Sequence, residues 1–191
     1  MVPIERDRLL EDEANEEVML IEKAQASPTA FAELYQRYQH RIYLYLRTRV
    51  TNDEDAADLT QQVFLRAFNA LPGYRHLGLP FAAWLFQIAR NAVTDSYRRR
   101  HNTIPWDDLP ESSHSMLSLD LEASVLRQES IVQLRKLLAQ LDPAKRELLA
   151  LRFAAGLSTP QIAAIVGRSP AAVKKDLTRT LQKLKEHYHE R

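Results

Sequence analysis

Six cations lie close together near the end of this 191-residue chain, on a segment with helical spacing. Between residues 168 and 185 they are opposed by a single acid, Asp176. A basic helix face can contact DNA phosphates, and each phosphate neutralised contributes about 0.9 to the slope of log affinity against log salt. Amides at the start of such a helix can also bind a phosphate. The segment therefore indicates nucleic-acid binding, and its cations are Arg168, Lys174, Lys175, Arg179, Lys183 and Lys185.

The residues around these cations follow the pattern of a helix-turn-helix. The stretch LSTPQIAAIVGRSPAAVKKDL (residues 157–177) contains two Ser-Pro-like helix starts separated by a turn at Gly167. Val173 and Leu177 face inward at helical spacing, and the second helix of such a unit enters the DNA major groove. The alternative is a helical hairpin with a solvated basic face, but the turn spacing and the caps favour DNA binding. The outward residues are Lys174, Lys175, Thr178, Arg179 and Gln182.

The charge of the whole chain is nearly balanced but unevenly distributed. With 26 Lys and Arg against 25 Asp and Glu, the formal net charge is +1. Residues 1–22 carry eight acids and two bases, and residues 105–126 carry five acids and no Lys or Arg. A second basic run, YRRRH, ends at His101. Two basic surfaces separated by an acidic connector are therefore expected.

The sequence lacks the patterns of enzymes and metal sites. There is no cysteine, which excludes disulfides, thiolate ligands and thiol nucleophiles. The six histidines are scattered apart from His187 and His189, and no Gly-rich phosphate loop, zinc pattern or nucleophile elbow occurs. We therefore expect a non-enzyme with no cofactor and no metal. No apolar run approaches the ~20 residues that span a bilayer, and the N-terminus lacks a signal peptide's apolar core, so a cytoplasmic protein without membrane insertion is expected.

Apolar residues recur at helical spacing in the segments that must position these surfaces. Because the chain also has only 4 glycines, the sequence predicts an all-α fold. A short helix is expected from about Glu16 to Ala26. Ser27-Pro28 and then Asn52 or Asp53 mark the starts of further helices, and LPGYRHLGLP (residues 71–80) is a loop. The predicted core stripes are Phe31, Leu34, Tyr38, Ile42 and Leu46; Ala56, Leu59, Val63 and Ala67; and Phe81, Leu85, Ile88 and Ala92.

Helical periodicity breaks over residues 102–126, which are predicted as an acidic flexible linker between two small helical domains. Beyond it, Asp142-Pro143 starts a helix that stops at Gly156, and the helix-turn-helix follows. The expected organisation is an acidic tail (1–14), a first domain (15–101), the linker (102–126), a second domain (127–187) and a short tail (188–191).

Two parts of the chain resemble a bacterial sigma factor of the sigma-70 type, most closely the small extracytoplasmic-function (ECF) group. DAADLTQQVFLRAF (residues 55–68), followed by FAAWLFQIARNAVTDSYRRR (residues 81–100), is similar to the family's second conserved region. LDPAKRELLALRFAAGLSTPQIAAIVGRSPAAVKKDL (residues 141–177) is similar to its fourth. The resemblance covers nearly everything from about Glu16 to Lys185.

The resemblance implies an RNA polymerase sigma factor, which directs promoter-specific initiation by binding core polymerase, reading the −10 and −35 elements and stabilising the opened strand. The implied partners are the clamp helices and flap of core polymerase, promoter DNA and an anti-sigma factor. The helix at residues 55–67 would dock on the clamp helices, and the segment around residues 148–153 would meet the flap. By helical spacing, the residues for clamp docking are Asp58, Gln61, Gln62, Leu65 and Arg66.

In such a protein the helix at residues 84–100 would read the −10 element on the opened non-template strand. Single-stranded readout needs a pocket for an unstacked base and cations for the backbone. Tyr74, Phe86 and Asn91 would form the pocket, and the arginines would hold phosphates, whereas Trp84 has the spacing of a core residue. The −10 residues are thus Tyr74, Phe86, Arg90, Asn91, Tyr97, Arg98, Arg99 and Arg100.

The second domain would bind the −35 element as duplex in the major groove. An arginine is frequent in the family where this chain has Asp176, and a carboxylate there repels phosphate unless it pairs with Arg179 or accepts from a cytosine amine. The acidic linker would either thread the polymerase's RNA path or simply stay extended, and both alternatives remain open. The −35 residues are Ser169, Ala172, Lys174, Lys175, Thr178 and Arg179.

A stand-alone helix-turn-helix transcriptional regulator is the alternative function. It predicts a ligand pocket in the N-terminal half and usually a dimer. That half instead ends in RRRH and has no evident constellation of ligand-binding residues.

Overall fold

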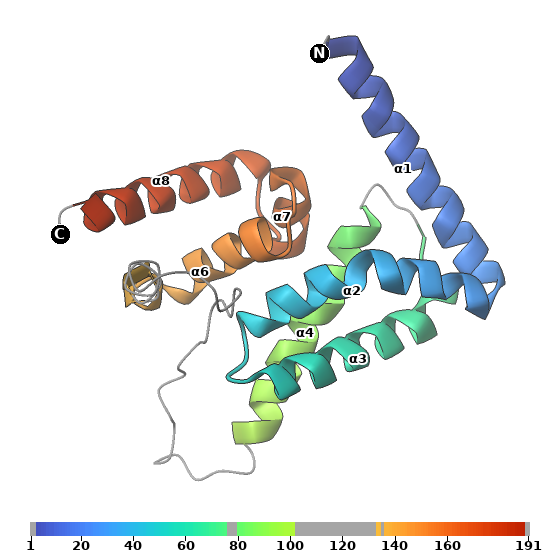
Figure 1. Ribbon diagram of the computed structural model, residues 1–191, viewed down its shortest axis with the longest axis horizontal. Coiled ribbons are helices and arrows are strands. Elements are labelled where there is room, and N and C mark those ends of the chain that lie inside the picture. The colour runs from blue at the N-terminus through green and yellow to red at the C-terminus, as the bar shows by residue number, and fades with distance from the viewer. Residues whose placement is uncertain (1–2, 76–79, 102–132, 135, 190–191) are drawn as a thin grey trace, which may run out of the picture.

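The computed structural model describes residues 3–75, 80–101, 133–134 and 136–189. All regular structure in these ranges is helical, so the predicted all-α fold is confirmed (Figure 1). The predicted linker lies outside the described residues. The α-helices are α1 (Pro3–Ala26), α2 (Phe31–Arg47), α3 (Asp53–Ala70), α4 (Phe81–His101), α6 (Pro143–Leu149), α7 (Thr159–Val166) and α8 (Pro170–His189), and the shorter turns are η1 (Pro28–Ala30), η2 (Leu71–Gly73) and η3 (Ala150–Ala154).

The helix starts mostly follow the local capping signals. Asn52 and Asp142 each accept a hydrogen bond from the amide three residues on, at 2.7 and 2.9 Å, as predicted. Ser27 differs, because its hydroxyl is hydrogen-bonded to the Thr29 hydroxyl and the following turn, η1, is a 3₁₀ turn. The first helix also begins earlier than expected: α1 starts at Pro3 and includes the acidic stretch predicted as a tail. The predicted domain boundaries themselves stay predictions.

The N-terminal unit, α1 to α4, is built around the predicted stripes. All nine stripe residues of α2 and α3 are buried, as are those of α4 apart from Ile88, which is partly covered. Aromatic rings meet at the start of α4, where Tyr74 and Trp84 lie 4.8 Å apart between ring centroids and both contact Phe81. Trp84 is partly buried and packs against the core cluster, as its spacing indicates.

The C-terminal unit, α6 to α8, contains a wide turn that the sequence did not predict. Instead of one helix from residue 143 to Gly156, α6 ends at Leu149 and continues as the π-helical turn η3. The Ala155 amide donates to the Ala150 carbonyl, five residues back, at 3.0 Å. Residues 148–151 are buried in succession, which requires cover on more than one side of the helix.

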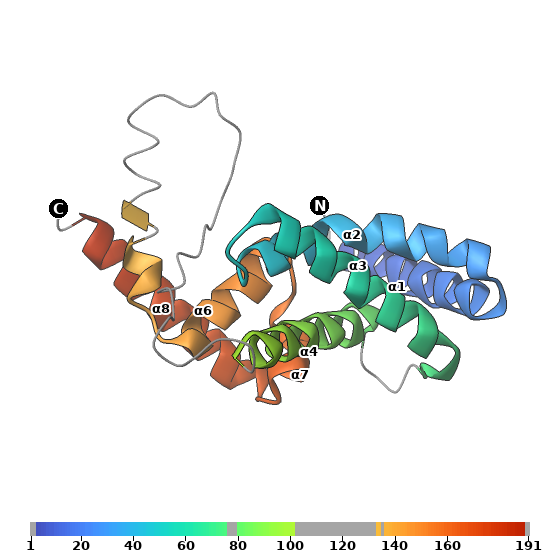
Figure 2. The same ribbon diagram turned by 90° about the horizontal axis from the view of Figure 1, so that it is seen from below.

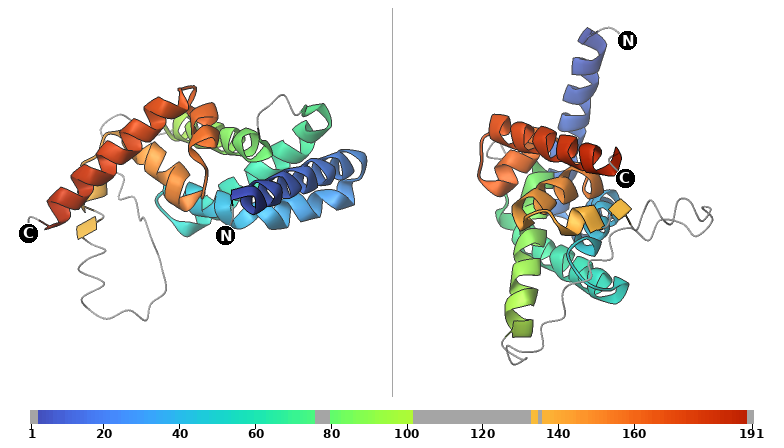
Figure 3. Two further views of the ribbon diagram at one scale, coloured as in Figure 1. Left: turned by 90° about the horizontal axis from the view of Figure 1, so that it is seen from above. Right: turned by 90° about the vertical axis from the view of Figure 1, so that its left-hand side faces the viewer.

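The second side is covered because the two units pack together. Helix α7 contacts α4, and η3 contacts α2, so the buried residues of both units form one continuous core. Helices α6 and α7 lie between α8 and the N-terminal unit (Figures 2 and 3). Helix α8 is therefore on the outside of the molecule.

Replacing Ile42 by alanine tests the core of the N-terminal unit. Ile42 is fully buried, so Ile42→Ala leaves a cavity and should lower the free energy of unfolding by about 2–5 kcal/mol. The exposed Gln36→Ala on the same helix should change it by less than about 0.5 kcal/mol. Urea denaturation followed by circular dichroism measures both, and equal losses would contradict the assigned packing.

Candidate nucleic-acid interface

The helix-turn-helix forms as the sequence predicts. Helix α7 starts with a capping box between Ser158 and Gln161 and ends at Gly167, whose φ of 67° is left-handed. The Ser169 hydroxyl then accepts from the Ala172 amide at 3.3 Å and caps α8. This chain of caps fixes the angle at which α8 leaves the turn.

The outward face of α8 carries the predicted cations. Val173 is fully buried and Leu177 nearly so, which turns the intervening residues outward. Ala172 is half-buried, and the Ser169 hydroxyl is already engaged by the cap. The exposed residues of the predicted −35 set are Ser169, Lys174, Lys175, Thr178 and Arg179, whose contact with DNA stays a prediction.

Asp176 is neutralised within the domain, but not by Arg179. Its carboxylate forms an ion pair with Arg168, on the turn between α7 and α8, at 2.7 Å. The partner that sequence reasoning proposed was the residue three positions later on the same helix. The Asp176 carboxylate balances the positive charge of Arg168, which remains exposed, so this cation of the basic segment contributes less net charge to the surface.

The basic end of α4 is exposed. Asn91, Arg98 and Arg99 are exposed, and Arg100 lies within α4, its side chain outside the described residues. Tyr97 is partly exposed, but its hydroxyl donates to the Arg49 carbonyl at 2.7 Å. This hydrogen bond connects α4 to the segment that directly follows α2.

The predicted base pocket does not form in this structure. Phe86 is 0% exposed and packs edge-on against Tyr45, with the Arg41 guanidinium 5.9 Å from its ring centroid. A side chain without exposed surface cannot stack on a base, so the predicted role of Phe86 does not hold here. Tyr74 is only 9% exposed, and burial raises the pKa of its hydroxyl. Of the three predicted pocket residues, only Asn91 is open to solvent.

The predicted clamp-docking face of α3 is partly open. Asp58, Gln61 and Leu65 are exposed, Leu65 to 62%. The other two members reach towards α4: Arg66 pairs with Asp95 at 2.8 Å, and Gln62 accepts from Arg99 at 3.4 Å. The helix predicted to read the −10 element and the predicted docking face are therefore in direct contact.

Sequence reasoning missed Phe68, which is also partly exposed and lies three residues after Leu65. The three-residue spacing of two apolar residues outside the core stripe was the available signal. Less of the segment predicted to contact the flap is exposed than expected: residues 148–151 are buried, and only Arg152 and Phe153 of residues 148–153 are exposed, Phe153 to 64%.

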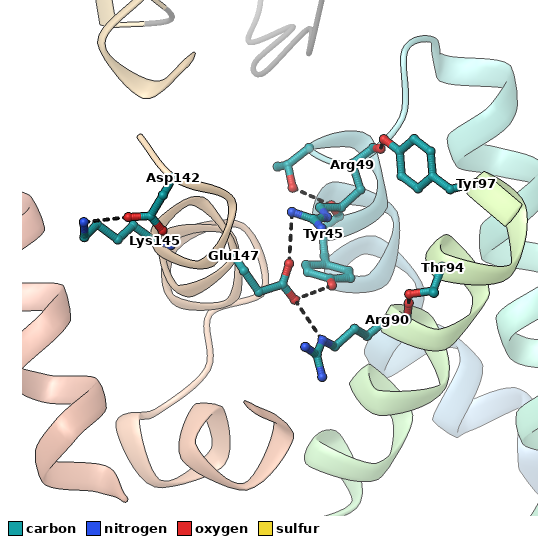
Figure 4. A network of polar contacts seen from close by, with 9 residues as sticks. Tyr45, Arg49, Arg90, Thr94, Tyr97, Asp142, Lys145 and Glu147 are labelled. Atoms are coloured by element: carbon teal, nitrogen blue, oxygen red, sulfur yellow. Dashed lines mark hydrogen bonds and ion pairs between the residues drawn. The ribbon is translucent and has the colours of Figure 1, made fainter. Parts of the chain in front are cut away.

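One predicted phosphate contact, Arg90, is exposed and also lies near a carboxylate of the C-terminal unit (Figure 4). Glu147 on α6 is 6% exposed and accepts from the Tyr45 hydroxyl at 2.7 Å. It also pairs with Arg49 at 3.0 Å and lies 3.9 Å from Arg90. Burial, followed by the nearby Glu147 charge, raises the pKa of Tyr45 well above its ordinary value, so the hydroxyl stays protonated and donates.

The comparisons with known proteins agree with the order of these two units. The family description "Sigma-70 region 2" matches residues 34–103, and "Sigma-70, region 4" matches residues 131–184. The chain is 32% identical over 176 residues to the ECF RNA polymerase sigma factor SigD of Mycobacterium tuberculosis, an alignment that covers 89% of this chain and 82% of SigD. The chain belongs to the sigma-70 family. Within that family it is an ECF-type sigma factor.

Two further relatives of this ECF-type sigma factor extend the comparison. It is 33% identical over 156 residues to the sigma factor BldN of Streptomyces coelicolor, covering 81% of this chain but only 59% of BldN. The solved structure of CnrH in complex with the cytosolic domain of CnrY aligns with a TM-score of 0.65 at 26% identity, over 89% of this chain and 95% of CnrH. A membrane-crossing helix is not found among the described residues.

Replacing Asp176 by asparagine tests the internal ion pair. The change removes one negative charge beside the predicted −35 surface and releases Arg168. We expect tighter duplex binding, with the slope of log affinity against log salt steeper by up to about 0.9, and a stability change within about 1 kcal/mol. Fluorescence anisotropy at several salt concentrations measures the slope.

The matched control is Glu186→Gln, the same charge change nearer the end of α8. Because Glu186 lies four turns from the start of α8, it should alter the slope less. An unchanged slope in Asp176→Asn would contradict the prediction that the surface beside Asp176 contacts DNA phosphates.

Proposed function

We propose that this ECF-type sigma factor confers promoter specificity on core RNA polymerase without catalysing a reaction itself. In this proposal α3 docks on the clamp helices, the basic end of α4 holds the opened non-template strand, and α8 reads the −35 element as duplex. The single observation that carries the proposal is the order of exposed surfaces: a polar face with Leu65 on α3, a basic end on α4 and a basic recognition helix in a helix-turn-helix.

The distribution of charge supports the proposal that this sigma factor needs a partner to bind DNA tightly. A net charge of +1 gives the chain little long-range attraction for DNA, and the cations predicted to contact DNA are divided between the end of α4 and the outward face of α8. Two weak DNA-binding sites gain affinity through effective concentration only when something holds them at the spacing of their targets. A polymerase that fixes both units would supply that spacing.

A protein that restrains the sigma factor is part of the proposal. Its relative CnrH was solved in complex with the cytosolic domain of CnrY, and that alignment covers most of this chain. The exposed apolar residues Leu65 and Phe68 lie where such a partner would compete with the clamp helices. We therefore expect an anti-sigma partner to block polymerase binding.

Run-off transcription with purified core polymerase on random-sequence promoter pools tests the function. We expect specific transcripts only when the sigma factor and core polymerase are both present. Gel shifts without polymerase provide the contrast, because tight operator binding by the chain alone would identify a stand-alone regulator and contradict the proposal.

Leu65→Glu tests the docking face. An interface core excludes charge, so this change should weaken binding to core polymerase by about tenfold or more. Because the side chain is largely exposed, the free energy of unfolding should change by less than about 0.5 kcal/mol. Met19→Glu, at an exposed apolar residue on α1, is the matched control, and equal binding of both variants in a pull-down titration would contradict docking through α3.

A further inference from the structure

A glutamine of α1 binds the turn that connects α3 to α4. The Gln25 side-chain amide donates to the Leu71 carbonyl at 3.0 Å and to the Tyr74 carbonyl at 2.7 Å. Leu71 begins η2 and Tyr74 directly follows it, so the two hydrogen bonds fix both ends of this turn. Gln25 is far from the turn in sequence, and α1 and η2 pack against each other.

The turn needs a donor from outside because of its own geometry. Within η2 the Tyr74 amide donates to the Leu71 carbonyl at 3.0 Å. Tyr74 itself is extended, with φ of −66° and ψ of 130°, so the chain leaves the 3₁₀ pattern there. A backbone carbonyl shielded from water requires a hydrogen-bond donor, and Tyr74 is only 9% exposed. Gln25 supplies the donor for the Tyr74 carbonyl.

Gln25 can fix the turn because its own helix is packed on the core. Ile21 and Ala24 are 5% and 6% exposed, and they precede Gln25 by four residues and by one. Glu17, two turns earlier on α1, accepts a hydrogen bond from the Tyr38 hydroxyl of α2. The end of α1 is therefore held against the N-terminal unit, and the Gln25 amide has a defined position.

The turn is in contact with the first residues of α4 through aromatic rings. Tyr74 lies 4.8 Å from Trp84 and 5.6 Å from Phe81 between ring centroids. The orientation of Tyr74 is thus set from two sides, by the rings of α4 and by the Gln25 amide on its carbonyl. Arg75, the next residue, is exposed, so the same carbonyl determines where this cation leaves the turn.

The exposed stripe of α4 ends close to this turn. At about 1.5 Å per residue, Trp84 and Arg98 lie about 21 Å apart along the axis of α4. A strand bound at the basic end of α4 that follows the stripe therefore reaches the aromatic rings and Arg75. The exposed residues of the stripe, at helical spacing, are Gln87, Asn91, Thr94 and Arg98.

We infer that Gln25 is a positioning residue for recognition of the −10 element. It does not contact DNA, but it fixes the η2 turn and Tyr74 beside the path of the opened strand. Sequence preference requires that the groups that meet a base are held in one geometry, so loss of this support should reduce preference more than affinity. The inference rests on the proposed function, whereas support of the turn is a property of the free chain.

Trp84 fluorescence tests the support of the turn without polymerase or DNA. The chain has two tryptophans, so Trp106→Phe leaves Trp84 as the single reporter. In this background, Gln25→Met keeps a side chain of similar length but removes the donor, and acrylamide should quench Trp84 about twofold more strongly. Gln36→Met, the same change at an exposed position of α2, should leave quenching unchanged.

A rescue variant separates the hydrogen bonds from side-chain packing. Gln25→Lys restores N–H donors at the same position, so its quenching should return to within about 20% of the background protein. Circular dichroism checks that all of these variants keep their helices. Equal quenching of Trp84 in Gln25→Met and in the background protein would overturn the support of the turn by Gln25.

Run-off transcription with core polymerase tests the role in recognition. Promoter pools are randomised at the −10 element or at the −35 element, and the transcripts are sequenced. In the chain with its natural tryptophans, Gln25→Met should weaken the base preference at the −10 element by about threefold or more, since the support of two hydrogen bonds is lost. The −35 preference should stay as in the wild type, and Gln25→Lys should retain both.

The outcomes distinguish this inference from the proposed function. Stronger quenching in Gln25→Met with an unchanged −10 preference would overturn the role in recognition. Equal weakening at both elements would also overturn it, because general damage does not select one element. No transcription from the wild type would contradict the proposed function and the recognition role together, while a quenching difference would still establish that Gln25 supports the turn.

Discussion

A carboxylate removed from water must find cations or hydrogen-bond donors, and Glu147 finds them across the contact between the two halves of this protein. The partners supplied to it by the described residues, Tyr45, Arg49 and Arg90, all belong to the N-terminal unit. Its desolvation is compensated only while α6 lies against α2 and α4. The apolar packing around it is non-directional, so directional contacts such as this charged cluster restrict how the two units can be placed.

Packing within and between the units explains why some surfaces expected to bind other molecules are closed. Phe86 is covered within the N-terminal unit by Tyr45 and Arg41 of α2, whereas residues 148–151 are buried in the core that both units share. By contrast, the outer face of α8 and most of the docking face of α3 are exposed, because neither takes part in the contact. The predicted polymerase-docking surface is thus accessible, while Arg90, one of the arginines predicted to bind the opened strand, lies near an internal carboxylate.

Local sequence patterns were sufficient to predict the helices and the buried residues of each unit. The stripes of α2 and α3, the caps at Asn52 and Asp142 and the turn at Gly167 follow directly from residue type and spacing. The predictions that failed concern residues whose surroundings are set by contacts with residues far apart in sequence. Phe86 lies outside the predicted stripe of α4, and the periodicity of that helix does not reveal that Tyr45 and Arg41 of α2 cover it. Likewise, the sequence around Glu147 does not reveal that the other unit covers this acid.

The π-helical turn η3 has a consequence for the comparison of related chains. One additional residue in this turn rotates everything after it by about 100° relative to a regular α-helix. A helical wheel drawn without interruption from Pro143 to Gly156 therefore assigns the wrong faces in its second half. In a homologue lacking that additional residue, the side chain equivalent to Phe153 would point in a different direction even where the aligned letters are identical.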